Sequence, residues 1–118
     1  PGIELVGSRV GYLQRAPAHA AMAELLARHP RIDGVWTAND VMAFGALDAL
    51  REAGRTATVV GINGLPEAIE NIERGTMLAS VDFSAFNIAA VATAAMLRHL
   101  DGHPVPAGHT PREYAEAV

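Results

Sequence analysis

The chain repeats one pattern four times: a short run of β-favouring apolar residues, a polar corner, and a segment with helical periodicity. The predicted strands cover residues 3–6, 34–38, 58–62 and 77–81. The predicted helices cover about residues 17–27, 41–53, 67–74 and 86–100. Strands that alternate with helices at this spacing pair in parallel through right-handed crossovers. The sequence therefore predicts an α/β fold, with an open parallel sheet and flanking helices.

Helix-ending residues stand where this pattern needs them. His29-Pro30 follows the first helical segment, and the other three are followed by Gly54, Gly75 and Gly102. Glycine adopts the left-handed conformation that commonly closes a helix, and proline cannot continue one. The Val59-Val60 pair lacks polar alternation, which is typical of a strand that is covered on both faces.

Composition excludes several classes of function. The 118 residues are half apolar and 19% charged, which fits one globular domain and not a disordered chain. The net charge is −4 and the nine basic residues, all Arg, are scattered, so no nucleic-acid-binding surface is expected. The chain has no Cys, which excludes disulfides and thiolate-metal sites, and no segment long and apolar enough to cross a membrane.

The chain begins on Pro1-Gly2, without an initiator Met or a signal peptide, and runs directly into a predicted strand. We expect an excised or truncated piece at least as readily as a natural mature start.

Polar residues follow the predicted strands. In open parallel sheets, ligands bind beyond the carboxyl ends of the strands. Those corners hold residues 7–14, Asn39-Asp40, Asn63-Gly64 and residues 82–84. Asn and Asp are both preferred helix caps, and one cap suffices, so either both residues are structural or one of them is left for function.

Each of these residues also has a structural interpretation. Asn63-Gly64 can be a tight turn, because both residue types tolerate positive φ. Phe83, Leu13 and Tyr12 can belong to the core.

Catalytic, metal and cofactor sites are not expected. The stretch Gly61-Ile62-Asn63-Gly64 lacks the third glycine of a dinucleotide fingerprint, and no phosphate loop or nucleophile elbow occurs. His99 and His103 are four residues apart, but a glycine and a proline break the helix that would align them. No nucleophile, base and orienting group can be assembled, so the chain is not expected to be an enzyme.

The corners also carry a resemblance to a known family. The stretches "IDGVWTANDVMAFGALDALREAGR" and "VVGINGLPEAIENIERGTMLASVDF" resemble the second half of a periplasmic sugar-binding protein, the solute-binding component of an ABC importer of the ribose-binding type. The upstream "GYLQRAPAHAAMAELLARHPRIDGV" is similar to the same family, so the likeness covers roughly residues 3–106. It implies that residues 1–118 form part of the carboxyl-terminal lobe of a two-lobe protein, which closes on its ligand by hinge motion.

The resemblance also implies a set of ligand-binding residues. Asn39 matches an Asn that binds sugar hydroxyls, which leaves Asp40 as the helix cap. Asn63 stands where most members have a ligand-binding Asp, and Phe83 where the ribose type has a ligand-binding Gln at the hinge. Leu13 stands where those members have a stacking aromatic residue, with Tyr12 beside it.

These departures bear on the ligand. An amide offers one acceptor and two donors where a carboxylate accepts twice, and Phe in place of Gln adds a flat apolar face. No Arg follows a strand closely, although Arg15 could reach from the first helix. The resemblance therefore implies a neutral sugar or polyol as ligand, an ABC permease in the membrane as partner, and a periplasmic location.

Two rival functions remain open. The lactose-repressor family has the same fold in its effector domain and shares the Asn-Asp-x-Met-Ala-x-Gly-Ala motif, but usually has a longer link before its Val-Val-Gly strand. An α/β enzyme is the second rival, and it lacks a catalytic constellation.

The segment over residues 86–100 is apolar on most of its circumference. Such a helix needs burial on more than one side. In the resembled family it crosses to the first lobe, so we expect the isolated chain to self-associate or to exchange this helix.

Overall fold

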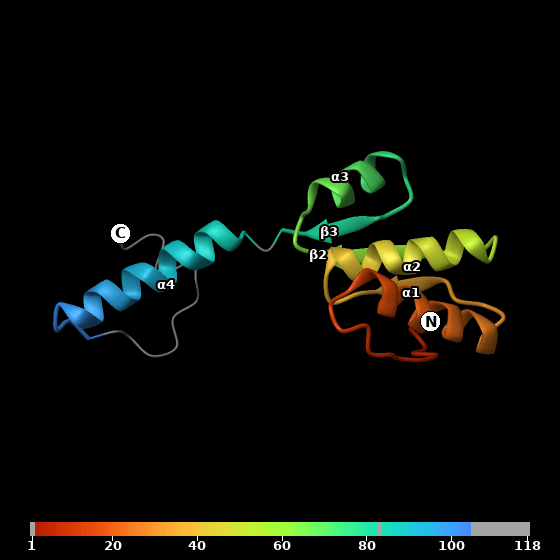
Figure 1. The fold of residues 1–118 in the computed structure, drawn as a ribbon, viewed down its shortest axis with the longest axis horizontal. Helices are drawn as coiled ribbons and strands as arrows, with labels where there is room; N and C mark the ends of the chain where they lie inside the picture. The colour runs from red at the N-terminus through yellow and green to blue at the C-terminus, as the bar shows by residue number, and fades with distance from the viewer. Residues whose placement is uncertain (1, 83, 105–118) are drawn as a thin grey trace. The chain divides into compact units, whose positions relative to one another are not determined.

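The computed structural model describes residues 2–82 and 84–104, and Figure 1 shows its elements. In chain order they are α1 (Arg15–Arg28), β1 (Gly34–Trp36), α2 (Asp40–Glu52), β2 (Thr58–Ile62), α3 (Pro66–Glu73), β3 (Ala79–Val81) and α4 (Ala85–Leu100). The chain divides into two compact units between Phe83 and Ser84. The first unit contains the sheet, and the second contains α4.

The three strands form one parallel sheet in the order β1-β2-β3, as predicted. Trp36 pairs with Val60, which pairs with Ala79 on its other side. Gly61 pairs with Ser80. In a parallel sheet, residues in register point to the same face, so Gly61 and Ser80 belong to one face and the row through Val60 to the other.

One face of the sheet carries the core. Val59 of β2, Ala43 and Phe44 of α2, and Ala68 of α3 are buried in the same apolar cluster. Helix α1 packs on α2 at Gly45, where a Cβ atom would lie 2.2 Å from the Arg15 carbonyl oxygen. The close approach of the two helices therefore needs a residue without a side chain.

The predicted helix ends are confirmed. At Gly54, Gly75 and Gly102 the φ angle is positive, and each glycine follows the C-cap residue of its helix. After α2, Gly54 N donates to Arg51 O and Arg55 N donates to Leu50 O, so carbonyls of the last helical turn accept hydrogen bonds from the residues that follow.

The predicted strand over residues 3–6 is wrong. This segment has no strand structure, and Ile3 and Leu5 are 103% and 83% exposed. A β-favouring run becomes a strand only when a neighbouring strand accepts its backbone hydrogen bonds, and this run has no such neighbour among the described residues.

The sheet face opposite the core is open. Trp36 and Val81 are 70% and 63% exposed, and Val60 and Ile62 are half-buried. The prediction that β2 is covered on both faces is therefore wrong within the first unit.

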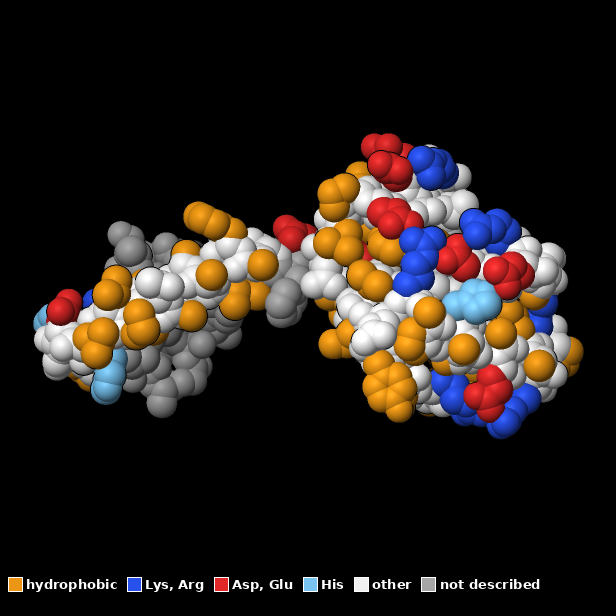
Figure 2. All heavy atoms as spheres, viewed as in Figure 1, with side chains coloured by type: hydrophobic (Ala, Val, Ile, Leu, Met, Phe, Trp, Pro, Cys, Tyr) orange, Lys and Arg blue, Asp and Glu red, His pale blue; other side chains and the backbone are white. Residues whose placement is uncertain are grey.

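Helix α4 has an apolar surface. None of its residues is buried, and Phe86, Met96 and Leu100 are among its exposed side chains. Figure 2 shows hydrophobic side chains along its length. Across residues 2–82 and 84–104, no helix has both the length and the apolar character needed to cross a membrane.

Candidate functional site

The carboxyl ends of the strands meet polar corners, as the sequence predicted. Asn39 follows β1, Asn63 follows β2 and Asp82 follows β3. Leu13 joins this edge from the loop before α1, because its carbonyl oxygen accepts from Asn39 Nδ2 at 3.3 Å. Contacts among these corners, and not only their order in the chain, therefore define a candidate site.

Asn39 is the N-cap of α2. Its Oδ1 accepts from the backbone amide of Met42 at 2.8 Å, three residues on. The prediction that Asp40 caps this helix is wrong, because the helix starts at Asp40, one residue earlier than expected. Asn39 is half-buried and both ends of its amide are hydrogen-bonded within the chain, so its contact with a ligand stays a prediction.

Asp40 turns inward instead. Its side chain is fully buried, and its Oδ2 accepts from the backbone amide of Leu65 at 2.8 Å. Its Oδ1 accepts from Ser80 Oγ at 2.6 Å. The carboxylate therefore joins the corner after β2 to strand β3.

Asn63 has an exposed side chain and an unusual backbone conformation. Its φ is 128°, in the region that favours glycine, and Gly64 follows with φ 67°. The Asn63 amide donates to Val81 O at 2.9 Å. Within the described part of the chain, no hydrogen bond involves its side-chain amide, which leaves that group available at the sheet edge.

Tyr12 and Leu13 form a turn with two successive left-handed residues. Their φ angles are 51° and 58°, and the Gln14 amide closes the turn on Gly11 O at 3.0 Å. Their side chains are 73% and 61% exposed, so neither belongs to the core. Left-handed conformations of bulky residues cost of order 1–3 kcal/mol each and are common at functional sites.

Phe83 lies outside the described residues, so its predicted role as an apolar face for the ligand stays a prediction. Ser84, the residue that follows, is the N-cap of α4 and has φ 22°.

The positive charge of Arg15 is already paired with two carboxylates. Its Nε donates to Asp48 Oδ2 at 2.7 Å, its Nη1 donates to Glu67 Oε1 at 2.9 Å, and its guanidinium lies 5.5 Å from the centre of the Phe44 ring. The hydrogen bond from Arg15 holds the pKa of Asp48 below its ordinary value, and the same bond raises the pKa of Arg15. On the face seen in Figure 2, acidic and basic side chains intermingle over the helices of the first unit.

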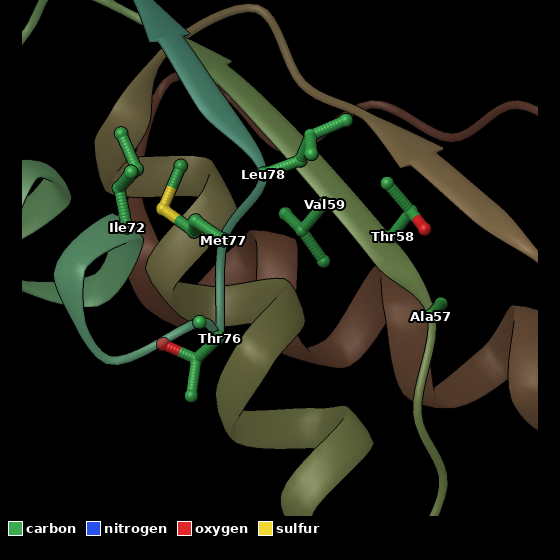
Figure 3. A pocket seen from close by; sticks show the side chains of 8 residues that line it. Ala57, Thr58, Val59, Ile72, Thr76, Met77 and Leu78 are labelled. Carbon is green, nitrogen blue, oxygen red and sulfur yellow. The ribbon is translucent and has the colours of Figure 1, made fainter.

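A hollow of about 360 Å³ lies elsewhere on the sheet (Figure 3). It is lined by residues at the start of β2, such as Thr58, and by the α3–β3 turn with Thr76 and Met77. These are the amino ends of the strands, so the hollow is not part of the candidate site. Within residues 2–82 and 84–104, no three His, Asp or Glu side chains are grouped as a metal site would require.

Ser80 and Gly61, which together accommodate Asp40, are not among the site residues predicted from the sequence. A Cβ atom on Gly61 would lie 2.3 Å from Asp40 Oδ1, so the carboxylate occupies the space above this glycine. Ser80 falls in register with the core-facing Gly61, and this pairing is known only from the structure.

Comparisons with known proteins agree on a family. The sequence profile of a periplasmic binding protein domain matches residues 1–104. A D-allose-binding periplasmic protein of Escherichia coli strain K12 is 36% identical over 97 residues, which cover 80% of this chain and 31% of that protein.

Solved structures lead to the same fold. The periplasmic binding protein component of the arabinose ABC transporter from Shewanella sp. ANA-3, bound to α- and β-L-arabinofuranose, superposes with a TM-score of 0.79 at 26% identity. That match covers 96% of this chain and 42% of the other. A LacI family transcriptional regulator from Arthrobacter sp. FB24, in complex with lactose, gives a TM-score of 0.66 at 26% identity and covers 81% of this chain and 36% of its own. The chain thus spans between 31% and 42% of the length of these three proteins.

Proposed function

Because the chain belongs to the periplasmic binding protein family, we propose that it forms most of the carboxyl-terminal lobe of a solute-binding protein. In this proposal the full-length protein binds a neutral sugar or polyol between two lobes and delivers it to the membrane permease of an ABC importer. Residues 86–100, which α4 contains, cross to the first lobe. The protein works in the periplasm, where the similar allose-binding protein is named as residing.

The observation that carries the proposal is the state of Asn63. Its backbone is fastened to β3, while its side-chain amide is exposed and has no hydrogen-bond partner in the described part of the chain. An amide offers two donors and one acceptor, which matches hydroxyl groups that both donate and accept. Asn39, the Tyr12-Leu13 turn and Phe83 complete this lobe's side of the ligand site.

The charges near the site favour a neutral ligand over an acidic one. Arg15 is the cation that could have reached the edge, and Asp48 and Glu67 already neutralise it. An acidic ligand would have to displace these carboxylates, which a hydroxyl-rich ligand need not do.

The similar proteins named above bind sugars and are not named as enzymes, which supports a binding function in place of catalysis. A regulator of transcription is the alternative, and the lactose-bound LacI family structure supports it. The two functions share this lobe and differ in what precedes it: a helix-turn-helix domain favours the regulator, and a signal peptide favours the importer component.

A calorimetric panel of neutral sugars, polyols, sugar acids and amino acids on the full-length protein tests the proposal. We expect a neutral sugar or polyol to bind, and Asn63→Ala to weaken that binding by about 1–3 kcal/mol, because buried ligand hydroxyls lose their partner. Glu73→Ala, an exposed change at the far end of α3, serves as the control and should bind normally. Binding of an acid or an amino acid alone would overturn the neutral-ligand proposal.

A further inference from the structure

One buried carboxylate links the corners that follow β1 and β2 to strand β3. Asp40 comes from the corner after β1, and its two oxygens accept from Leu65, beyond β2, and from Ser80 of β3. A buried carboxylate is costly unless donors satisfy it. Here it occupies the first position of α2, where the helix dipole favours negative charge, and it has two short hydrogen bonds.

Three consecutive backbone amides at the candidate site are hydrogen-bonded, and the second and third of them bond to Ser80 and Asp40. The Asn63 amide donates to Val81 O at 2.9 Å, and the Gly64 amide donates to Ser80 Oγ at 3.0 Å. The Leu65 amide donates to Asp40 Oδ2 at 2.8 Å. Because Ser80 Oγ accepts from Gly64 and donates to Asp40, the serine and the carboxylate act as one unit.

The unit acts on the corner that carries Asn63 and not on its own helix. The first turn of α2 is capped by Asn39, so the Asp40 side chain is not needed there. The serine and the carboxylate hydrogen-bond to a corner that has two positive φ angles in succession, at Asn63 and Gly64. A non-glycine residue in that conformation persists only when its surroundings hold it there.

We propose that Asp40 and Ser80 are positioning residues, which hold the Asn63 side-chain amide in its binding orientation before the ligand arrives. This inference rests on the proposed function, because it assigns the two residues to the same sugar site. A corner that is already ordered loses less conformational freedom when the ligand binds, so affinity depends on residues that never touch the ligand.

Ser80→Ala in the full-length protein provides the main test. It removes the hydroxyl that joins Gly64 to Asp40, and we expect the sugar to bind about tenfold more weakly while the protein stays folded. Ser80→Thr keeps the hydroxyl and suits a strand, so it should restore most of the affinity. Asp40→Asn is the second variant: an amide keeps only one acceptor oxygen, so either Ser80 Oγ or the Leu65 amide loses its acceptor, and we expect the same direction of change.

A double-mutant cycle separates positioning from general stability. In an Asn63→Ala background, Ser80→Ala should cause no further loss of affinity, because the group that it positions is already gone. The matched control is Thr76→Val, which removes the Thr76 hydroxyl bonds to Asn71 in the α3–β3 turn. We expect it to lower thermal stability without changing sugar affinity.

The outcomes distinguish the inference from the function on which it rests. If the wild-type protein binds no neutral sugar or polyol, the proposed function fails and the inference fails with it. If the wild type binds and Ser80→Ala binds equally well, or weakens the Asn63→Ala variant by the same factor, the positioning role alone is overturned.

Discussion

At the scale of single residues, Asn39 and Asp40 show how far a sequence can specify a site. The sequence predicts that one of the two caps α2, because both types are preferred caps. It cannot say which one, since that depends on whether the helix starts at Asp40 or at Val41, and the burial of the Asp40 carboxylate decides this. The deciding partners, Leu65 and Ser80, are 25 and 40 residues away in the chain, so no local pattern reports them.

We predict that Asn39→Ala lowers the free energy of unfolding of the full-length protein by about 1 kcal/mol, because the Met42 amide loses its cap. Asn39→Asp keeps a cap oxygen and should stay close to wild type in stability. It places an oxygen where Nδ2 now donates to Leu13 O, so we expect it to disturb the Tyr12-Leu13 turn and weaken sugar binding. Urea denaturation followed by circular dichroism measures the first effect and calorimetry the second. An alanine variant as stable as wild type would exclude Asn39 as the cap.

A second prediction concerns the Arg15–Asp48 pair. Arg15→Met should destabilise the full-length protein by about 0.5–1 kcal/mol near neutral pH, a modest effect because the Arg15 side chain is 46% exposed and therefore screened. The pKa of Asp48 is lowered in the folded state. The pair therefore stabilises the protein fully at pH values above 3.8, the ordinary pKa of Asp, and this stabilisation is lost as the pH falls through the lowered pKa.

The difference between Arg15→Met and wild type should therefore shrink in acid. Denaturation midpoints measured across a pH series check this. Arg74→Met, which breaks an exposed pair with Glu70 on α3, is the control and should change stability little at any pH. A difference that persists unchanged at low pH would assign the effect of Arg15 to packing on Phe44 and not to charge.

At the scale of elements, the helices and the strands differ in how well the sequence predicts them. Each helix starts and ends within two residues of its prediction, because helical periodicity and the glycine or proline that follows are local signals. Strand β2 is predicted to the residue, whereas β1 and β3 are two residues shorter than expected. The strand predicted over residues 3–6 does not form, because a strand depends on a partner strand that its own sequence does not specify.

The packing of α1 on α2 yields a third prediction. A methyl group on Gly45 would lie 2.2 Å from the Arg15 carbonyl oxygen and 2.9 Å from the His19 amide nitrogen, and neither backbone atom can move without moving α1. Gly45→Ala should therefore destabilise the full-length protein by about 1–3 kcal/mol or more, the usual cost of overpacking, despite the better helix propensity of alanine. Thermal unfolding of the variant measures this.

The matched control is Gly34→Ala in β1. There a Cβ atom would meet nothing closer than Thr58 O at 3.8 Å, which is ordinary contact. We expect this variant to unfold close to the wild-type temperature. If both glycine variants were equally stable, the close approach of the two helices would not require Gly45.

At the scale of the whole molecule, each of the two units exposes an apolar surface among its described residues. One is the sheet face that carries Trp36, Val60 and Val81, and the other is the surface of α4, none of whose residues is buried. The Val59-Val60 pattern predicted a strand covered on both faces, and the first unit covers only one. The apolar run in the sequence thus specifies that a cover is required, and it does not specify which segment supplies it.

We therefore predict that these 118 residues, produced alone, self-associate. Burying apolar surface stabilises an assembly by about 25 cal/mol per Å². A stable interface buries roughly 1,000 Å² of surface in total, and both exposed surfaces are available for this. Sedimentation velocity across a concentration series should show oligomers, and Trp36→Lys combined with Met96→Glu should shift the population toward monomer, because each change places a charge on one of the two surfaces. Glu73→Ala, on neither surface, should leave the distribution unchanged. A wild-type chain that stays monomeric at high concentration would contradict the prediction, since both surfaces would then be stable in water without a partner.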